Sequence, residues 1–235
     1  MGYFLIVFWL QLWPINTHRP TQGINAMVVE KSALQIESGY QPFSIPAVSF
    51  MHEGILQGRY GIGAFWELFW TASGLLPSPK GASLSVALKR NFYRSAKLSL
   101  AIAGWGYLPM LGQSLGGQIW SLTDVTLSPN GTLSINFVGG YFETGAQGFL
   151  TAFYTHTWEG KTSAWGELFA YIPSSPGEAK NRYGFGAGVQ RLLGKRRLTA
   201  VDIAANCSLD RRIQLMIGLS RKMQTFSLQS RKKSS

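Results

Sequence analysis

The sequence predicts an all-β fold: a closed antiparallel up-and-down transmembrane β-barrel, with short turns on one side and longer loops on the other. Three observations support this prediction. Apolar residues alternate with small or polar ones along most of the chain, turn-forming residues separate the alternating segments, and only 14% of the 235 residues are charged. Soluble domains carry about 25% charged residues. A barrel strand in a bilayer shows this alternation because one face meets lipid and the other an enclosed interior.

The chain begins with an apolar run at residues 3–13, YFLIVFWLQLW, which has the length of the apolar core of an export signal. No Lys or Arg precedes it, which departs from the usual pattern. Cleavage is expected as late as Ala26, although Ile24 stands where a small residue is preferred. A buried first helix or strand is the alternative. After residue 13 no apolar stretch reaches the roughly 20 residues that a transmembrane helix needs.

From Ser32 onward, apolar side chains recur at every second position, which is the period of a β-strand. The runs indicate about twelve strands. Ten is also possible, because the phase changes near residues 120–127 and aromatic residues occupy both faces at 149–158. The apolar faces are Leu34 and Ile36; Ala64, Trp66, Leu68 and Trp70; Leu84, Val86 and Leu88; Leu98, Leu100 and Ile102; Leu133, Ile135 and Phe137; Tyr183, Phe185, Ala187 and Val189; Val201, Ile203 and Ala205; and Ile213, Leu215, Ile217 and Leu219.

Turn-forming residues separate these segments at 77–81, 129–131, 174–177 and 194–195. Asn130-Gly131 is a strong signal for a tight turn between strands. A soluble sandwich or a lipocalin would also alternate, but it would keep charged residues outside, whereas here they gather at segment ends. Aromatic residues near segment ends predict girdles at the two membrane interfaces. These residues are Trp70, Trp105, Tyr107, Tyr141, Trp158 and Tyr171.

The net charge of +11 first suggests a nucleic-acid partner. The cations, however, lie in turn-like positions at 89–90, 94, 195–197, 211–212 and 231–233, not along one helix face. We therefore expect no nucleic acid, and instead contact with anionic lipid headgroups or attraction of an anionic solute. A soluble basic β-domain that binds nucleic acid or polysaccharide is the alternative. The single Cys207 excludes an internal disulfide framework.

Charged and polar residues on the small-residue face of the strands are the candidates for the barrel interior. Arg or Lys facing lipid at mid-bilayer would cost about 2–4 kcal/mol. Two roles are open for these side chains: they line a solute path, or they form ion pairs that hold a narrow barrel closed. The lumen-facing candidates are Glu37, Arg59, Glu67, Lys89, Asn136, Glu167, Asp202 and Gln214.

One motif suggests catalysis: residues 112–116, GQSLG, match the G-x-S-x-G elbow of hydrolases, with Ser114 as nucleophile. That elbow requires a helix after the serine, whereas residues 117–127 read as a strand. We therefore expect no enzyme, although a barrel enzyme acting on lipids through Ser114 and His156 stays an alternative. His18, His52 and His156 are too scattered for a ligand cluster, so neither a metal site nor a cofactor is expected.

Residues 17–40, THRPTQGINAMVVEKSALQIESGY, resemble the mature start T-D-R-P-T-Q-(variable)-V-V-P-K-G-x-L-Q-I-E-T-G-F of an outer-membrane family. This family consists of transporter-like β-barrels and includes the meta-pathway of phenol degradation proteins. Residues 56–62, 198–206 and 217–221 are similar to its L-L-R-Y-G-L, L-Q-L-D-x-x-x-G and G-L-S-x-R motifs. Departures from the pattern are His18 for Asp, Glu30 for Pro, and Phe69 for Arg in the family's E-L-R.

The resemblance implies a bacterial outer-membrane protein that passes a small hydrophobic or anionic solute passively. It also implies cleavage near Asn16, and therefore a signal peptide at 1–16, an N-terminal segment at 17–31, the barrel at 32–223 and a basic tail at 224–235. Outer-membrane lipid and the barrel-assembly machinery are the other expected partners. Barrels of this type end in an aromatic residue which that machinery recognises, but here the last strand runs through Lys222 and Met223.

Overall fold

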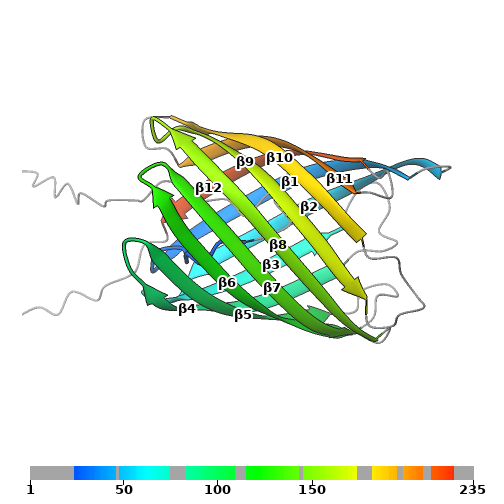
Figure 1. Cartoon of the computed structure of the whole chain (residues 1–235), viewed down its shortest axis with the longest axis horizontal. Coiled ribbons are helices and arrows are strands. Elements are labelled where there is room, and N and C mark those ends of the chain that lie inside the picture. Colours follow the sequence, from blue (N-terminus) through cyan, green and yellow to red (C-terminus); the bar gives the residue numbers. More distant parts are fainter. Residues whose placement is uncertain are drawn as a thin grey trace, which may run out of the picture.

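The computed structural model describes residues 24–45, 48–74, 83–108, 115–142, 145–173, 182–194, 198–208 and 213–224. Within these residues twelve strands form one closed antiparallel barrel (Figure 1), which confirms the predicted fold and excludes the ten-strand alternative. The strands are β1 (Ala33–Ile45), β2 (Val48–Gly61), β3 (Trp66–Ser73), β4 (Ser83–Arg94), β5 (Leu98–Leu108), β6 (Gly116–Ser128), β7 (Gly131–Phe142), β8 (Gly145–Trp158), β9 (Thr162–Pro173), β10 (Arg182–Leu193), β11 (Thr199–Ser208) and β12 (Ile213–Gln224).

The barrel closes where β1 pairs with β12, from Ala33 opposite Gln224 to Ser44 opposite Ile213. All the remaining pairings join strands that follow one another in the sequence, from β1 with β2 to β11 with β12. Closure leaves no strand edge with unpaired backbone groups, which is the condition for a sheet to stand in hydrocarbon. In the described ranges there is no helix of the length and hydropathy needed to span a membrane.

The two ends of the barrel differ in their connections. We call the end where β1 begins and β12 ends the terminal rim, and the opposite end the far rim. Connections at the terminal rim cover residues 62–65, 95–97, 129–130, 159–161 and 194–198, and the predicted turn before Gly131 is among them. The three longest connections, 74–82, 109–115 and 174–181, all lie at the far rim. This asymmetry matches the predicted short turns and longer loops. The sequence-predicted turns at 77–81 and 174–177 lie outside the described residues.

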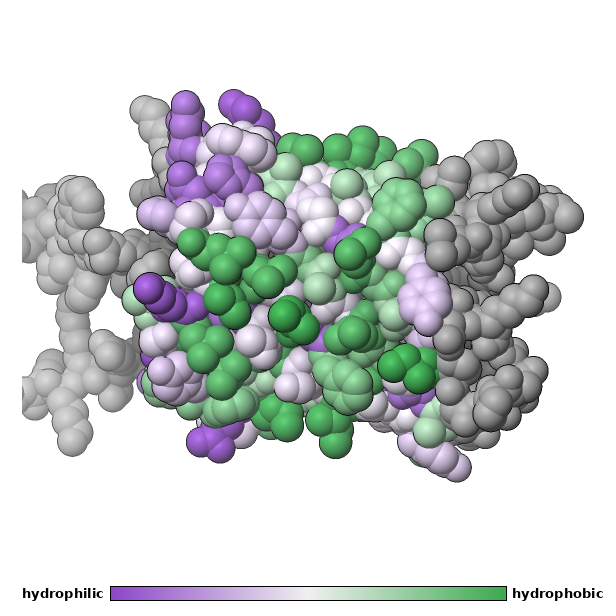
Figure 2. Space-filling view, in the orientation of Figure 1, coloured by the Kyte–Doolittle hydropathy of each residue, from purple (hydrophilic) through white to green (hydrophobic). Residues whose placement is uncertain are grey.

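The strands place apolar side chains on the outside of the barrel and polar ones inside, which is the reverse of a soluble protein. On β12, Leu215, Ile217 and Leu219 are exposed at 50–57%, while Ser220 and Lys222 are buried. On β4, Val86 and Leu88 are exposed and Lys89 is buried at 2% exposure. On the face that Figure 2 shows, apolar side chains form a broad band over the middle of the barrel. Exposure of these side chains to water is unfavourable, so the outer surface is suited to an apolar environment.

The interior is more aromatic than the alternation predicted. On β8, Phe149 and Phe153 are buried inside, while Tyr154 and Trp158 are exposed on the outer face. Aromatic residues on both faces explain why residues 149–158 gave an ambiguous pattern. Residues 120–127, where the phase changes, belong to one strand, β6, whose inward side chains include Leu122.

Two groups of expected positions are wrong. Trp105, Tyr107 and Tyr171 were assigned to interfacial girdles, but they lie on the inward phase of β5 and β9 and contact other interior side chains. Lys89 and Arg90 were expected in a turn, but they lie within β4. Both errors have one cause: a segment end in the sequence need not coincide with the end of a strand that continues toward a rim.

Candidate functional site: the interior of the barrel

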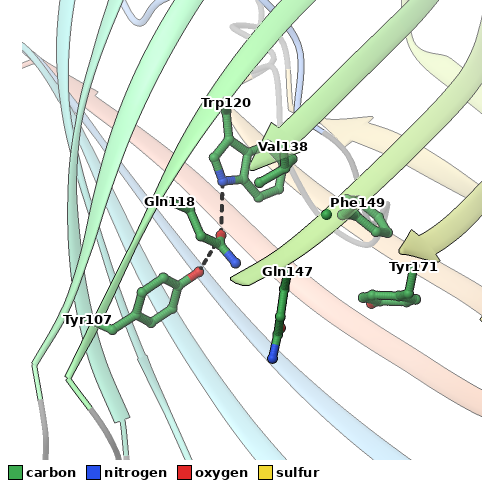
Figure 3. A pocket seen from close by; sticks show the side chains of 8 residues that line it. Tyr107, Gln118, Trp120, Val138, Gln147, Phe149 and Tyr171 are labelled. Atoms are coloured by element: carbon green, nitrogen blue, oxygen red, sulfur yellow. Dashed lines mark hydrogen bonds between the residues drawn. The ribbon is translucent and has the colours of Figure 1, made fainter. Parts of the chain in front are cut away.

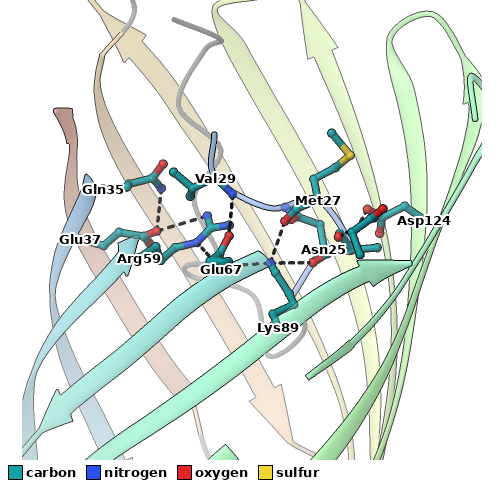
Figure 4. A network of polar contacts seen from close by, with 11 residues as sticks. Asn25, Met27, Val29, Gln35, Glu37, Arg59, Glu67, Lys89 and Asp124 are labelled. Carbon is teal, nitrogen blue, oxygen red and sulfur yellow. Dashed lines mark hydrogen bonds and ion pairs between the residues drawn. The ribbon is translucent and has the colours of Figure 1, made fainter. Parts of the chain in front are cut away.

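Residues 24–31, the inner segment, run inside the barrel along the wall formed by β7, β6, β4 and β3 (Figure 4). The chain then turns at Ser32, whose φ of 60° is uncommon for a residue other than glycine, and enters β1. Ile24, Ala26 and Val29 are buried at 7% exposure or less. The sequence predicted a segment leading into the barrel, but the lining of the wall by its backbone was not foreseen.

The inner segment is extended, so its own backbone groups have no helical or sheet partners along most of its length. Wall side chains bind them instead. The amide of Asn136 accepts from Ile24 N at 2.7 Å and donates to Ile24 O at 2.8 Å. Asp124 accepts from Ala26 N at 2.8 Å, and Asn91 donates to Ala26 O at 3.0 Å. Buried backbone groups require such partners, so these side chains fix the path of the segment.

A charge cluster forms at the terminal-rim end of this contact. Glu67 lies between Arg59, with two contacts of 2.9 Å, and Lys89, at 3.3 Å. The same carboxylate accepts from Val29 N at 2.7 Å, and Lys89 donates to Met27 O at 2.7 Å (Figure 4). All three charged side chains are at most 2% exposed. The three charged side chains therefore form ion pairs with one another, and Glu67 and Lys89 also hold the backbone of the inner segment by hydrogen bonds.

The inner segment is also fastened where it meets β1. Glu30 forms an ion pair with Lys222 of β12. Gly61 lies directly beneath the segment, and a Cβ at that position would collide with the carbonyls of Val29 and Glu30. The amide of Ser32 donates to Gly61 O at 2.7 Å. Glycine at position 61 therefore permits the close approach of the two backbones.

The eight lumen-facing candidates are distributed over two walls. Arg59, Glu67, Lys89 and Asn136 contact the inner segment or its partners, and Glu37 lies 3.8 Å from Arg59 and accepts from Gln35 at 2.8 Å. Glu167, buried on β9, accepts from Thr151 at 2.9 Å, and Asp202 is buried on β11. Gln214 lies on β12 opposite Asn206, and its side chain is not among those described.

Beyond the inner segment, toward the far rim, aromatic rings line the wall in a continuous arc. Phe69 packs edge-on against Trp105 with centroids 4.9 Å apart, and Trp105 lies 5.2 Å from Trp120. The arc continues to Phe149 at 6.3 Å, and from there to Tyr171 at 4.7 Å. Such separations allow favourable ring–ring contact. The sequence held a signal for this arc, since Trp105 and Tyr107 share the phase of Ala101 and Ala103, opposite to Ile102.

The arc borders a cavity of about 200 Å³ (Figure 3). One row of paired positions supplies its aromatic part: Trp120 is opposite Val138, Val138 opposite Phe149, and Phe149 opposite Tyr171. The next row places Gln118 and Gln147 on either side of Gly140. Tyr107 completes the lining beside Gln118. No charged residue lines this cavity in the described part of the chain.

Of the residues suspected of catalysis or metal binding, His156 is the one whose side chain the structure describes. Asp124 is buried inside the barrel, whereas His156 lies on the outer face with Tyr154 and Trp158. Ser114 lies outside the described residues, as do His18 and the predicted signal peptide at 1–16. Among the described residues no group of three or more His, Cys, Asp or Glu is arranged to hold a metal ion. Asp124, the acid that follows Ser114 in the sequence and would complete a Ser-Asp-His set, therefore cannot act on one substrate group with His156.

Comparison with known proteins adds the fold but no family. No family model matches the sequence, and no curated protein matches it. The fold is similar to that of the KdgM porin, solved in complex with disordered oligogalacturonate, with TM-score 0.68 and 8% identity over 82% of this chain and 99% of that one. It is also similar to the COG4313 outer membrane channel from Pseudomonas putida F1, with TM-score 0.67 and 10% identity over 87% of this chain and 100% of that one. The NanC porin gives TM-score 0.63 and 9% identity over 81% of this chain and 100% of that one.

These identities are too low to carry function across, so the likeness shows a shared porin-like barrel fold. The resemblance to the meta-pathway of phenol degradation proteins stays a prediction.

Proposed function

We propose that this chain is a bacterial outer-membrane channel that passes a small solute passively through the barrel. The observation that carries the proposal is the inversion of the two faces. Leu168, Ile119 and Phe137 are 57–68% exposed on the outside, while Glu67, Arg59 and Asn136 are at most 1% exposed inside. In a soluble barrel, both the exposure of apolar side chains outside and the burial of charged ones inside would be unfavourable. In a bilayer, apolar side chains are favoured on the lipid face and polar side chains on the inner face. KdgM, NanC and the P. putida protein are porins or channels by name, which supports the proposal.

The outer surface supports one orientation in the membrane. The exposed Lys and Arg side chains, among those described, all lie toward the terminal rim, and Figure 2 shows hydrophilic residues gathered at that end. Arg90 stacks over Trp66 at 5.1 Å, a pairing suited to the headgroup level of a bilayer. We call this set the basic collar: Lys31, Arg90, Arg94, Lys97, Lys161, Arg191 and Arg221.

The collar and the short turns place the terminal rim on the periplasmic side in this proposal, because outer-membrane barrels have short periplasmic turns. Seven cations with one exposed acid, Glu159, near them would then meet anionic headgroups of the inner leaflet. In this proposal the exposed positive charge contacts lipid, in place of the nucleic acid that the net charge first suggested. The barrel-assembly machinery remains the proposed partner for insertion.

The interior bears on the class of solute. The three buried cations in the described part of the chain each contact an acid: Arg59 and Lys89 contact Glu67, and Lys222 contacts Glu30. Glu167 and Asp202 are buried carboxyl groups on the other wall. Among the described residues, an anionic solute therefore finds no buried cation that is not already in contact with an acid. Of the two expected classes, hydrophobic and anionic, the aromatic arc favours the hydrophobic one.

Permeation of refolded protein tests the proposal. The protein is reconstituted in liposomes, and single-channel conductance and the uptake of small neutral and anionic solutes are measured, with Glu67→Gln as a variant that loosens the inner segment. We expect selective permeation of neutral solutes and a higher conductance for the variant. Recovery of the native protein in the soluble fraction without detergent would contradict membrane placement. Folded, reconstituted barrels that pass no solute would contradict the channel.

A further inference from the structure

We propose that the far-rim cavity is a solute-binding site for an uncharged, ring-shaped solute that carries a hydroxyl or carbonyl oxygen. The inference rests on the proposed channel and gives its solute a chemical class. It follows from three properties of the cavity: the direction of its amide groups, its flat apolar walls, and its lack of charge.

The Gln118 amide is held in one orientation. Its Oε1 accepts from the Trp120 Nε1–H at 3.0 Å and from the Tyr107 hydroxyl at 2.9 Å. An indole N–H can only donate, so the atom that it contacts must be the amide oxygen. The Nε2 group, which holds two N–H donors, therefore points away from both rings, and Figure 3 shows it on the side toward Phe149 and Gln147.

A second amide faces the same space. Gln147 lies in the same transverse row as Gln118, and Gly140 stands between them without a side chain to fill the gap. The Nε2 of Gln118 and the side chain of Gln147 have no hydrogen-bond partner among the described residues. The site thus offers donors at a fixed place, and an oxygen of a solute can accept from them.

The walls fix the shape of the solute. Trp120, Phe149 and Tyr171 follow one another along the inside of β6, β8 and β9, with Phe149 and Tyr171 4.7 Å apart. Flat rings in this arrangement contact the face of another ring better than they contact a branched chain. The cavity of about 200 Å³ is smaller than the roughly 300–1,000 Å³ of drug-sized sites, so a molecule of one ring fits.

The described residues that line the cavity carry no charge, and this fixes the polarity of the solute. The described lining holds two amides, two phenols and one indole with polar atoms, and apolar surface. A carboxylate would have to lose its hydration without a cation in return, which is costly. A neutral solute with one or two oxygens meets the amide donors without this penalty. Binding must also be weak enough for release, because a channel retains a tightly bound solute.

Binding to the full-length protein in detergent tests the inference, with tryptophan fluorescence and calorimetry as readouts. The probes are benzyl alcohol, toluene as the same ring without an oxygen, benzoate as its anionic analogue, and glucose as a neutral sugar ring. We expect saturable binding of benzyl alcohol or of glucose, and much weaker binding of toluene and benzoate. The better of the two ligands tells whether an aromatic alcohol or a sugar supplies the ring. No saturable binding of either, or equal binding of benzoate, would overturn the inference.

Matched variants locate the binding. Gln118→Leu and Gln147→Leu each remove donors from the cavity, and each should raise the dissociation constant about fivefold, the loss of roughly one hydrogen bond. Gln190→Leu makes the same chemical change on β10 near the terminal rim and should leave binding unchanged. An equal effect of all three variants would place the solute elsewhere.

The two proposals fail separately. Permeation without binding at the cavity would leave the channel standing and remove this site. Binding without permeation would leave the site and remove the channel.

Discussion

The two halves of the barrel interior use polar groups in opposite ways. Toward the terminal rim, Glu67, Lys89, Asp124 and Asn136 are occupied by one another and by the backbone of the inner segment. Toward the far rim, the amides of Gln118 and Gln147 retain donors that no described residue uses. A polar residue inside a barrel is therefore not by itself a sign of a solute path. Whether its hydrogen-bonding capacity is already filled decides the matter.

Charge separates the halves in the same way. The terminal half concentrates buried ions, which are stable only as a connected set. The far half has aromatic rings and amides instead. These groups bind a neutral solute weakly, and no charge has to lose its hydration. The comparison predicts that substitutions in the terminal half mainly change stability, and that substitutions in the far half mainly change which solutes pass.

The largest expected effect is that of Glu67→Gln. The change removes the carboxylate that Arg59 and Lys89 share, leaves Arg59 with the longer 3.8 Å contact to Glu37, and weakens the contact with Val29 N. Removal of one partner of a buried ion pair costs about 3–5 kcal/mol. The free energy of unfolding, measured by urea denaturation in lipid vesicles, should fall by that amount. Glu159→Gln, at an exposed turn, is the control and should be neutral. Equal stability of the two variants would show that the buried charge cluster does not stabilise the terminal half.

A smaller loss is expected for Asn136→Leu. The substitution keeps the number and branching of the side-chain heavy atoms but removes both hydrogen bonds to Ile24, leaving a buried N–H and a buried C=O without their partner. About 2 kcal/mol of unfolding free energy should be lost. Because the beginning of the inner segment is then released from β7, single-channel conductance should rise. An unchanged conductance together with unchanged stability would show that Asn136 does not hold the segment.

Phe149→Leu tests the far half. The ring contacts of Phe149 with Trp120 and Tyr171 are lost and the cavity grows. Stability should fall by only about 1 kcal/mol, since the space opens toward the lumen and not into a closed core. The relative uptake of one-ring and two-ring neutral solutes into liposomes should shift toward the larger. A loss of stability as large as that of Glu67→Gln would remove the distinction between the halves.

The smallest effect is expected outside the barrel, at the basic collar. Arg90→Gln removes one exposed cation and its stacking on Trp66, worth about 0.5–1 kcal/mol. Refolding yield should fall slightly in vesicles that contain anionic lipid and should not change in zwitterionic vesicles. The same decrease in both lipids would mean that the collar does not recognise headgroup charge.

The positions of interior residues show how far sequence reasoning extends. The period of two assigned Glu67, Arg59, Lys89, Asn136, Glu167 and Asp202 to one face of their strands, and each of these side chains is buried in the structure. The same reasoning misplaced Trp105, Tyr107 and Tyr171, because aromatic residues near segment ends occur both in girdles and in a lumen. Alternation gives the face of a strand, but the identity of a side chain does not tell which face is outside.

Local features could be predicted from the sequence: the strand period, the turns such as Asn130-Gly131, and the apolar outer faces of strands such as β4 and β12. The partners of the interior side chains could not, because they depend on how the strands are arranged in space. Ile24 and Asn136 are 112 residues apart, and Ala26 and Asp124 are 98 apart, yet both pairs are hydrogen bonded. The physical reason is closure. Joining β1 to β12 wraps the wall around one small volume, and only that geometry determines which polar groups are satisfied there and which stay open to a solute.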